Sequence, residues 1–286
     1  MKLLVTGGAG RLGAEVTRLL ALEGHSVRAF DLPNVDWGTV SRIDNVDVFK
    51  GDITSPAQVA EACVDVDAVV HLAALLPPGS ERNRDLTMRI NVEGTGNLLK
   101  ALGPLKKTPI ILASSITVYG VTSAEELPIR ESHSRKATDN YSESKIMAEE
   151  LAESSGSPYT VLRIAPISVA DLLEPPETIP YKGDQRVEFI YLEDAAHAIA
   201  STLERPKTRS RTYNIAGGAS WQMTGADYIR RFYSALGVDV EPNFSDEYAA
   251  LDWYDTSSSC LLGYQRTSFN DFEAKLRKIA EELGLR

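Results

Sequence analysis

Tyr141 and Lys145 stand four residues apart in a segment, 140–154, that is predicted to be a helix, so their side chains share one face. A free phenol has a pKa of about 10 and is a poor base at neutral pH. An ammonium group about 4 Å away would favour the phenolate by roughly 4 kcal/mol at an effective dielectric of about 20, which would lower the phenol pKa toward neutrality. Tyr141 could then take a proton from an alcohol, or return one to a carbonyl. The alternative is a surface Tyr–Lys pair, a common spacing in helices.

Ser115 ends a predicted strand, 108–115, and carries a hydroxyl that could hold the reacting oxygen of a substrate. An oxidised nicotinamide ring beside Tyr141 would lower the phenol pKa further, and Lys145 could hydrogen-bond the nicotinamide ribose.

A glycine-rich turn near the start of the chain could bind such a dinucleotide cofactor. Glycines at positions 7, 8, 10 and 13 follow the apolar run 3–5 and precede a helical pattern of apolar residues at 12, 16, 19 and 20. A helix N-terminus presents unpaired N–H groups and a partial positive charge, and glycines let a ligand approach the backbone. The pattern therefore predicts a bound dinucleotide pyrophosphate. The alternative is a tight turn with no ligand.

Two aspartates end the next predicted strands. Asp31 closes the strand 26–31 and could accept both hydroxyls of the adenosine ribose, while repelling the extra phosphate of NADP. Asp52 follows the strand near 46–50, where it could accept a hydrogen bond from the adenine amino group. Asp31 could instead be a plain turn residue, and Asp52 a helix N-cap.

Strands and helices alternate along the first 165 residues, which predicts an α/β fold with a doubly wound parallel sheet, the Rossmann arrangement. The nearly all-apolar run 67–74 fits a strand covered on both faces, and His71 within it is interpreted as a core residue. We expect an NAD-binding domain of residues 1–165 with returning segments 188–216. Residues 166–187 and 217–286 are expected to form a small C-terminal substrate-binding lobe.

Composition limits the class of protein. The 286 residues carry a net charge of −10, with a pI near 5.0, which argues against nucleic acid and anionic membranes as partners. Cys63 and Cys260 lie far apart without ligand-like spacing, so we expect packed thiols in a reducing compartment and no metal. No signal segment precedes the first strand and no apolar run approaches about 18 residues. We expect a cytoplasmic protein.

Several motifs occur together in one order: TGGAGRLG at 6–13, GDI at 51–53, HLAA at 71–74, NVEGTGNLL at 91–99, SSITVYG at 114–120 and YSESK at 141–145. This order resembles the extended branch of the short-chain dehydrogenase/reductases, the NAD-dependent epimerase/dehydratase family. The segments FIYLEDAAHAIA at 189–200 and YNIAGG at 213–218 resemble the later part of the same family.

The resemblance implies NAD as cofactor and hydride transfer at a secondary alcohol or its ketone. For the cofactor, it implies that Gly7, Gly10, Gly13, Arg11 and Leu12 surround the phosphates, that Asp31 binds the ribose and that Asp52 and Ile53 bind the adenine; Leu72, Ala73 and Ala74 would line the cofactor, with Asn91 as the structural asparagine of its site. For catalysis, it implies that Ser115, Tyr141 and Lys145 form the catalytic triad. The substrate would contact Ser115, Thr117 and Tyr141.

Departures from the family pattern bear on the substrate. Only about twenty residues separate the strand near 159–165 from Phe189, whereas nucleotide-sugar enzymes place a diphosphate site in a longer insert. Arg186 stands one position from the family's phosphate-binding arginine, and it is either a substrate contact or a surface charge. We expect a small hydroxylated substrate, such as a sugar or sugar acid. The alternatives are a nucleotide-sugar epimerase with tightly held NAD and a non-catalytic dinucleotide sensor.

A homodimer is also expected. Two helices are predicted near 85–102 and 140–154, and the corresponding helices form a two-fold interface in the family. Apolar residues lie on them at helical spacing: Leu86, Ile90, Leu98, Met147 and Leu151. The alternative is that these residues only cover the sheet.

Overall fold

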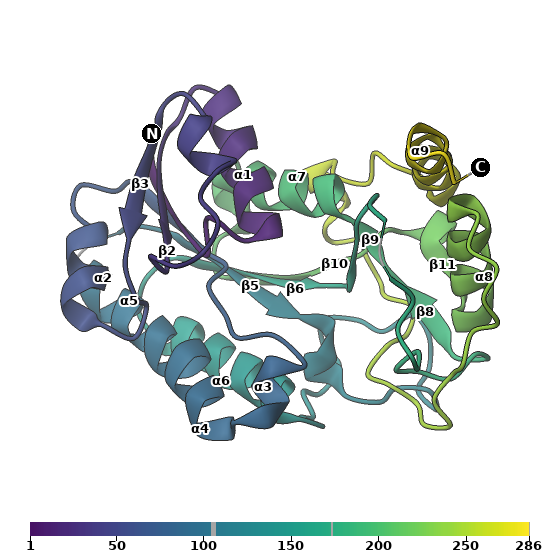
Figure 1. The fold of residues 1–286 in the computed structure, drawn as a ribbon. Helices are drawn as coiled ribbons and strands as arrows, with labels where there is room; N and C mark the ends of the chain where they lie inside the picture. Colours follow the sequence, from purple (N-terminus) through teal and green to yellow (C-terminus); the bar gives the residue numbers. More distant parts are fainter. Residues whose placement is uncertain (104–106, 173, 286) are drawn as a thin grey trace.

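The computed structural model describes residues 1–103, 107–172 and 174–285. In this part of the chain, seven parallel strands form one sheet in the order β3-β2-β1-β4-β5-β6-β10 (Figure 1). The strands are β1 (Lys2–Thr6), β2 (Ser26–Asp31), β3 (Val46–Lys50), β4 (Ala68–His71), β5 (Ile110–Ser115), β6 (Tyr159–Ile164) and β10 (Arg211–Ile215). The predicted doubly wound parallel sheet is confirmed. Its strand order reverses between β1 and β4, and ligands bind sheets of this kind outside the carboxyl ends of the strands at such a point.

Helices cover both faces of the sheet (Figure 1). One face carries α1 (Arg11–Leu22) and α7 (Leu192–Leu203), and the other carries α2 (Pro56–Ala62), α5 (Gly94–Leu102) and α6 (Asn140–Ser154). Among the described residues, no helix combines the length and apolar composition that crossing a membrane requires.

The predicted helix 85–102 is present but interrupted. It consists of α4 (Arg84–Met88), a π-helical turn (Arg89–Glu93) and α5, and the short helix α3 (Gly79–Arg82) precedes it. A π-turn adds a residue to one turn and changes the direction of its side chains, and such turns are frequent at functional sites. Asn91 lies within this turn.

The remaining elements lie beyond β10, at the right of Figure 1. β8 (Arg186–Glu188) pairs antiparallel with β11 (Gln222–Thr224), and β7 (Ile167–Ser168) pairs parallel with β9 (Ile190–Tyr191). The helices α8 (Gly225–Leu236) and α9 (Phe269–Glu282) pack against each other. The division of the chain into an NAD-binding domain and a substrate-binding lobe stays a prediction.

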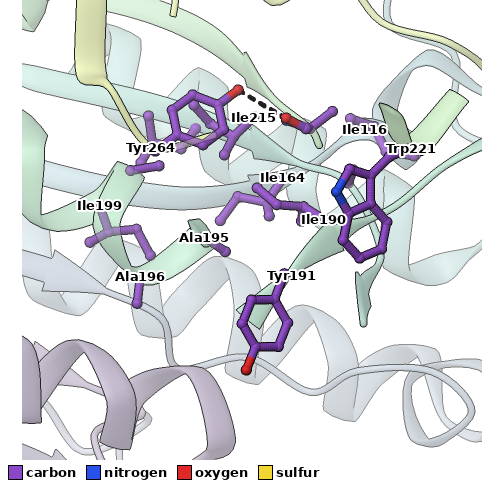
Figure 2. Packing of buried hydrophobic residues seen from close by; sticks show 14 of the residues in the cluster. Ile116, Ile164, Ile190, Tyr191, Ala195, Ala196, Ile199, Ile215, Trp221 and Tyr264 are labelled. Atoms are coloured by element: carbon purple, nitrogen blue, oxygen red, sulfur yellow. Dashed lines mark hydrogen bonds between the residues drawn. The ribbon is translucent and has the colours of Figure 1, made fainter. Parts of the chain in front are cut away.

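One hydrophobic core joins the sheet to these later elements. Figure 2 shows Ile164 and Ile215 from neighbouring strands among the rings of Trp221 and Tyr264, with Ile199 of α7 nearby. These side chains are at most 6% exposed. Because buried apolar surface from both regions forms one cluster, the C-terminal elements are fixed against the sheet near the carboxyl ends of its strands.

Candidate active site

The glycine-rich turn between β1 and α1 is closed by its own backbone. Gly7 has a φ of +70°, a conformation that favours glycine, and Gly10 N–H donates to the Gly7 carbonyl at 3.1 Å. A Cβ added at Gly13 would lie 1.9 Å from the same carbonyl oxygen, and one at Gly7 would lie 2.8 Å from Ala73 N. Gly10 caps α1 without a side chain, so the first N–H groups of α1 have no side-chain cap there.

A cavity of about 1010 Å³ opens beside this turn, along the carboxyl ends of the strands. This volume is at the upper end of the range of about 300–1,000 Å³ for ligand sites. The described residues that line it include most of the predicted site: Gly7, Gly10, Arg11, Leu12, Gly13, Asp31, Asp52, Ile53, Leu72, Ala73, Ala74, Ser115, Thr117, Tyr141 and Lys145. Asn91 and Arg186 are not among them. The structure thus places the glycine-rich turn and the three predicted catalytic side chains around one space.

The two predicted cofactor carboxylates also have structural partners. Asp31 Oδ2 accepts a hydrogen bond from Ala9 N–H at 3.1 Å, and Oδ1 accepts from Leu32 N–H at 2.8 Å. Asp52 Oδ1 accepts from Thr54 N–H at 2.8 Å. Ser55, rather than Asp52, is the N-cap residue of α2. Asp31 therefore links the end of β2 to the glycine-rich turn, and Asp52 shapes the loop that follows β3.

The predicted triad lies where β5 meets α6. Lys145 Nζ donates to the Ala113 carbonyl at 2.8 Å and lies 5.6 Å from the centroid of the Tyr141 ring. Ser115 Oγ accepts hydrogen bonds from Thr117 N–H at 3.2 Å and from Thr117 Oγ1 at 3.0 Å. The Ser115 side chain also lies close enough to the Tyr141 phenol to lower its pKa. A substrate hydroxyl could therefore meet Ser115 and Tyr141 together.

Burial controls the ionisation of this group. The pKa of the Tyr141 phenol is raised above 10 because burial disfavours the phenolate, while the Ser115 side chain partly opposes the rise. The prediction of a lowered phenol pKa is therefore wrong for the protein alone, because the loss of solvation raises it and the Asp139 carboxylate adds to the rise. Burial also lowers the pKa of Lys145 to about 8, against the pull of the Glu149 carboxylate.

Asn91 braces the backbone beside the cavity. Its Oδ1 accepts from Leu75 N–H at 2.7 Å, and its Nδ2 donates to the Leu75 carbonyl at 3.1 Å and to Ser144 Oγ at 2.9 Å. Ser144 Oγ in turn donates to the Tyr141 carbonyl at 2.7 Å. Asn91 thus ties the loop after β4 to the turn of α6 that carries Tyr141.

His71 is a buried core residue, as predicted. Thr95 Oγ1 donates its hydrogen to the Asn91 carbonyl at 2.6 Å, so His71 Nε2 must donate to Thr95 Oγ1, 2.9 Å away. Nδ1 therefore accepts from Thr6 Oγ1 at 2.7 Å. Burial and the nearby Lys145 lower the pKa of His71 to about 3, so the ring is neutral.

These features fit a dinucleotide. The glycine-rich turn forms a tightly closed cradle, in which a Cβ at Gly7 or Gly13 would clash with backbone atoms. A helix N-terminus faces the cavity, and a carboxylate stands at the end of β2. A model of the NAD dependent epimerase/dehydratase family matches residues 3–216.

The chain belongs to this family.

The prediction of an NAD-dependent enzyme of this type is confirmed at the level of the family. D-erythronate dehydrogenase of Cupriavidus necator is 36% identical over 130 residues, 42% of this chain and 40% of that protein. Human sterol-4-alpha-carboxylate 3-dehydrogenase, decarboxylating, is 27% identical over 252 residues, 79% of this chain and 62% of that protein. The match thus spans less than two thirds of the length of these two relatives.

Two further comparisons cover nearly the whole chain. UDP-glucose 4-epimerase of Halalkalibacterium halodurans is 24% identical over 306 residues, covering 93% of this chain and 90% of that protein. The structure of UDP-glucose-4-epimerase from Stenotrophomonas maltophila, with bound NAD and formylated UDP-arabinopyranose, has a TM-score of 0.85 and 25% identity, covering 99% of each chain. NAD is therefore the cofactor of the family and of this structural neighbour.

Arg186 lies away from the cavity of this epimerase/dehydratase family member. Its guanidinium makes a two-pronged ion pair with Asp252, with Nε–Oδ1 at 2.7 Å and Nη2–Oδ2 at 3.0 Å, and Nη2 also donates to the Ser123 carbonyl at 3.2 Å. Asp252 is 1% exposed. Arg186 is thus bound within the C-terminal elements, and the predicted substrate contact has no support from its position.

Sequence reasoning missed charged residues near the site, among them Arg89 and Glu149. Arg89, on the π-turn, lines the cavity with an exposed side chain. Glu149, on α6, is fully buried and pairs with Arg163 of β6. A signal for the second was present, because Glu149 follows Lys145 at helical spacing and Arg163 interrupts an otherwise apolar strand.

Proposed function

We propose that this protein is an NAD-dependent oxidoreductase that transfers a hydride at a secondary alcohol, or its ketone, of a small hydroxylated substrate. One observation carries the proposal: a single cavity is lined by the glycine-rich turn, by Asp31 and by Ser115, Tyr141 and Lys145. Each group would be of little use for this reaction without the others, because alcohol oxidation needs a hydride acceptor and a proton acceptor at the same carbon.

The residues have distinct roles. Ser115 orients the substrate hydroxyl, and Tyr141 takes its proton in the oxidative direction or returns it in the reductive one. Bound NAD supplies the hydride acceptor and a positive charge that favours the phenolate. Lys145 stands beneath the Tyr141 ring, held by the Ala113 carbonyl at 2.8 Å, and as a cation it favours the phenolate as well.

The substrate proposed from the sequence is a sugar or sugar acid, and the similarity to D-erythronate dehydrogenase supports it. A nucleotide-sugar epimerase is the second candidate, because a UDP-glucose 4-epimerase matches 93% of this chain. Against it, the described residues of segment 166–187 that line the cavity are Pro166, Ile167 and Val169, and Arg186 is bound to Asp252. This lining offers no charged side chain to a diphosphate from that segment.

Substitution of Tyr141 tests the reaction. Tyr141→Phe keeps the ring and removes the hydroxyl, so turnover should fall by about 10² or more while NAD still binds. NADH formation is followed with a panel of hydroxy acids, sugars and other secondary alcohols, and NAD binding by calorimetry. Tyr248→Phe, on an exposed ring, is the matched control. Parental turnover in Tyr141→Phe would overturn the mechanism.

The same measurements separate the alternatives. An epimerase would interconvert UDP-sugars without net NADH formation. A non-catalytic dinucleotide sensor would bind NAD and turn over none of these compounds.

A further inference from the structure

One face of α6 carries a third polar residue after the proposed catalytic pair. Tyr141, Lys145 and Glu149 follow each other at intervals of four residues, so they lie on three successive turns of the same side. Glu149 is 0% exposed and Lys145 is 6% exposed. A buried carboxylate is costly unless its oxygens are fully paired, so its partners indicate what it holds in place.

Both oxygens of Glu149 are fully engaged. Oε1 accepts hydrogen bonds from Ser114 Oγ at 2.5 Å and from Arg163 Nε at 3.0 Å. Oε2 accepts from Arg163 Nη2 at 2.7 Å and from Arg135 Nη1 at 3.0 Å. The carboxylate therefore connects α6 to the end of β5 and to β6, one helical turn below Lys145.

The end of β5 is held by α6 at two adjacent residues. Lys145 Nζ donates to the Ala113 carbonyl at 2.8 Å, and Glu149 binds the side chain of Ser114. Ser115 is the next residue, and its hydroxyl lines the cavity. The separation between Ser115 and Tyr141 is thus fixed through these two contacts.

We propose that Glu149 is a positioning residue for hydride transfer: through Ser114 and Arg163 it sets the strand ends that present Ser115 to Tyr141 and Lys145. This inference rests on the proposed function of the same site.

Glu149 also acts on Lys145 through its charge. Glu149 on α6 and the neutral His71 on β4 interact with Lys145, the Tyr141 ring lies beside it, and the guanidinium of Arg163 on β6 faces Glu149. Asp139, the N-cap residue of α6, acts on Tyr141. Burial lowers the pKa of Lys145 and Glu149 raises it. Without Glu149, Lys145 would lose its proton at a lower pH, and activity that needs the cation would be lost there.

The first variant, Glu149→Gln, keeps the shape and removes the charge. We expect kcat to fall about tenfold or more with a smaller change in KM, and the alkaline limb of the pH profile to move to lower pH. Glu150→Gln is the matched control, because Glu150 is the next residue on α6 and its side chain is 58% exposed. The assay uses NAD and the panel compound that the parent oxidises fastest. An unchanged kcat and pH profile in a folded Glu149→Gln would overturn the proposal.

A second variant keeps the test decisive if Glu149→Gln does not fold, since Arg163 would be left buried without its partner. Ser114→Ala keeps the ion pair and removes only the contact to β5. We expect kcat to fall several-fold at unchanged NAD affinity. The alkaline limb of the pH profile should stay at the same pH as in the parent, because the charge of Glu149 remains. Parental kcat in a folded Ser114→Ala would contradict the positioning role.

Titration of Lys145 in protein labelled with ¹⁵N-lysine is independent of any substrate. The Lys145 ammonium signal should disappear at lower pH in Glu149→Gln than in the parent and in Glu150→Gln.

If Tyr141→Phe keeps parental turnover, the proposed function fails. If Tyr141→Phe is inactive while Glu149→Gln and Ser114→Ala behave as the parent, only the positioning role of Glu149 fails.

Discussion

Asp31 Oδ2 accepts a hydrogen bond of 3.1 Å from the backbone N–H of Ala9, in the middle of the glycine-rich turn. The residue proposed to bind the adenosine ribose therefore also holds the loop proposed to bind the phosphates. A substitution at Asp31 that removes both the charge and the acceptor would change the two parts of the cofactor site together.

Asp31→Asn separates these effects. It keeps an oxygen that can accept from Ala9, and removes the charge that would repel the extra phosphate of NADP. The parent should prefer NAD, and in the variant the ratio of the affinity for NAD to that for NADP should fall by about tenfold or more. Calorimetry with both cofactors measures the ratio, and Asp36→Asn, on an exposed carboxylate in the following loop, is the control. Equal affinities of the parent for NAD and NADP would contradict the assignment.

Gly13→Ala tests the closed form of the turn. The added Cβ would lie 1.9 Å from the Gly7 carbonyl oxygen, so the backbone must move apart. We expect NAD affinity to be lost and the free energy of unfolding to fall by about 1–3 kcal/mol. Gly96→Ala is the matched control in α5, because its Cβ would first meet Leu151 Cδ1 at 4.0 Å. That variant should gain up to about 1 kcal/mol. NAD binding unchanged in Gly13→Ala would rule out the proposed cradle.

His71 makes stability depend on pH. The unfolded chain binds a proton at His71 below a pKa of about 6.5, whereas the folded ring has a pKa of about 3. Between these values the unfolded state binds more protons, so the free energy of unfolding falls as pH falls, by up to about 1.4 kcal/mol per pH unit from this group. Urea titrations at several pH values should show a shallower dependence in His71→Gln than in the parent and in His133→Gln. Equal slopes in the three proteins would refute this account.

Leu86 and Met147 test the predicted homodimer. They lie on α4 and α6 and are 42% and 38% exposed, whereas Leu98 of the same predicted set is fully buried against the sheet. An isologous contact over the exposed pair would be broken by charge, so Leu86→Glu with Met147→Glu should halve the mass seen by light scattering. Leu22→Glu, on α1 and 71% exposed, should leave the mass unchanged. A parent of monomer mass at micromolar concentration would remove the proposal.

Features set by local chemistry were predicted from the sequence. The turn at Gly7 to Gly13 and the strand that ends at Asp31 follow from glycine spacing and hydrophobic pattern, and the structure reproduces both. The helix Asn140–Ser154 was predicted with the same bounds. The structure shows Asp139 as its N-cap, and Gly156 follows its end.

Features set by tertiary contacts were not predicted. The π-turn at Asn91 depends on hydrogen bonds to Leu75 and Ser144, which lie 16 and 53 residues away, and no local pattern encodes them. The raised pKa of Tyr141 depends on how deeply the ring is buried, which spacing from Lys145 does not reveal. The position of Arg186 depends on its ion pair with Asp252, which lies 66 residues further along the chain and which the sequence does not reveal.

Because Tyr141, Lys145 and Glu149 are spaced at four-residue intervals, the helical repeat of α6 fixes their positions relative to one another. Inserting one residue between Lys145 and Glu149 would turn everything after it by about 100°, which would carry the carboxylate away from Ser114 and Arg163. One inserted between Tyr141 and Lys145 would rotate the phenol away from the ammonium group instead. Divergent descendants of this chain can therefore exchange the residues of α6 that face water, but they cannot change its length between these three positions.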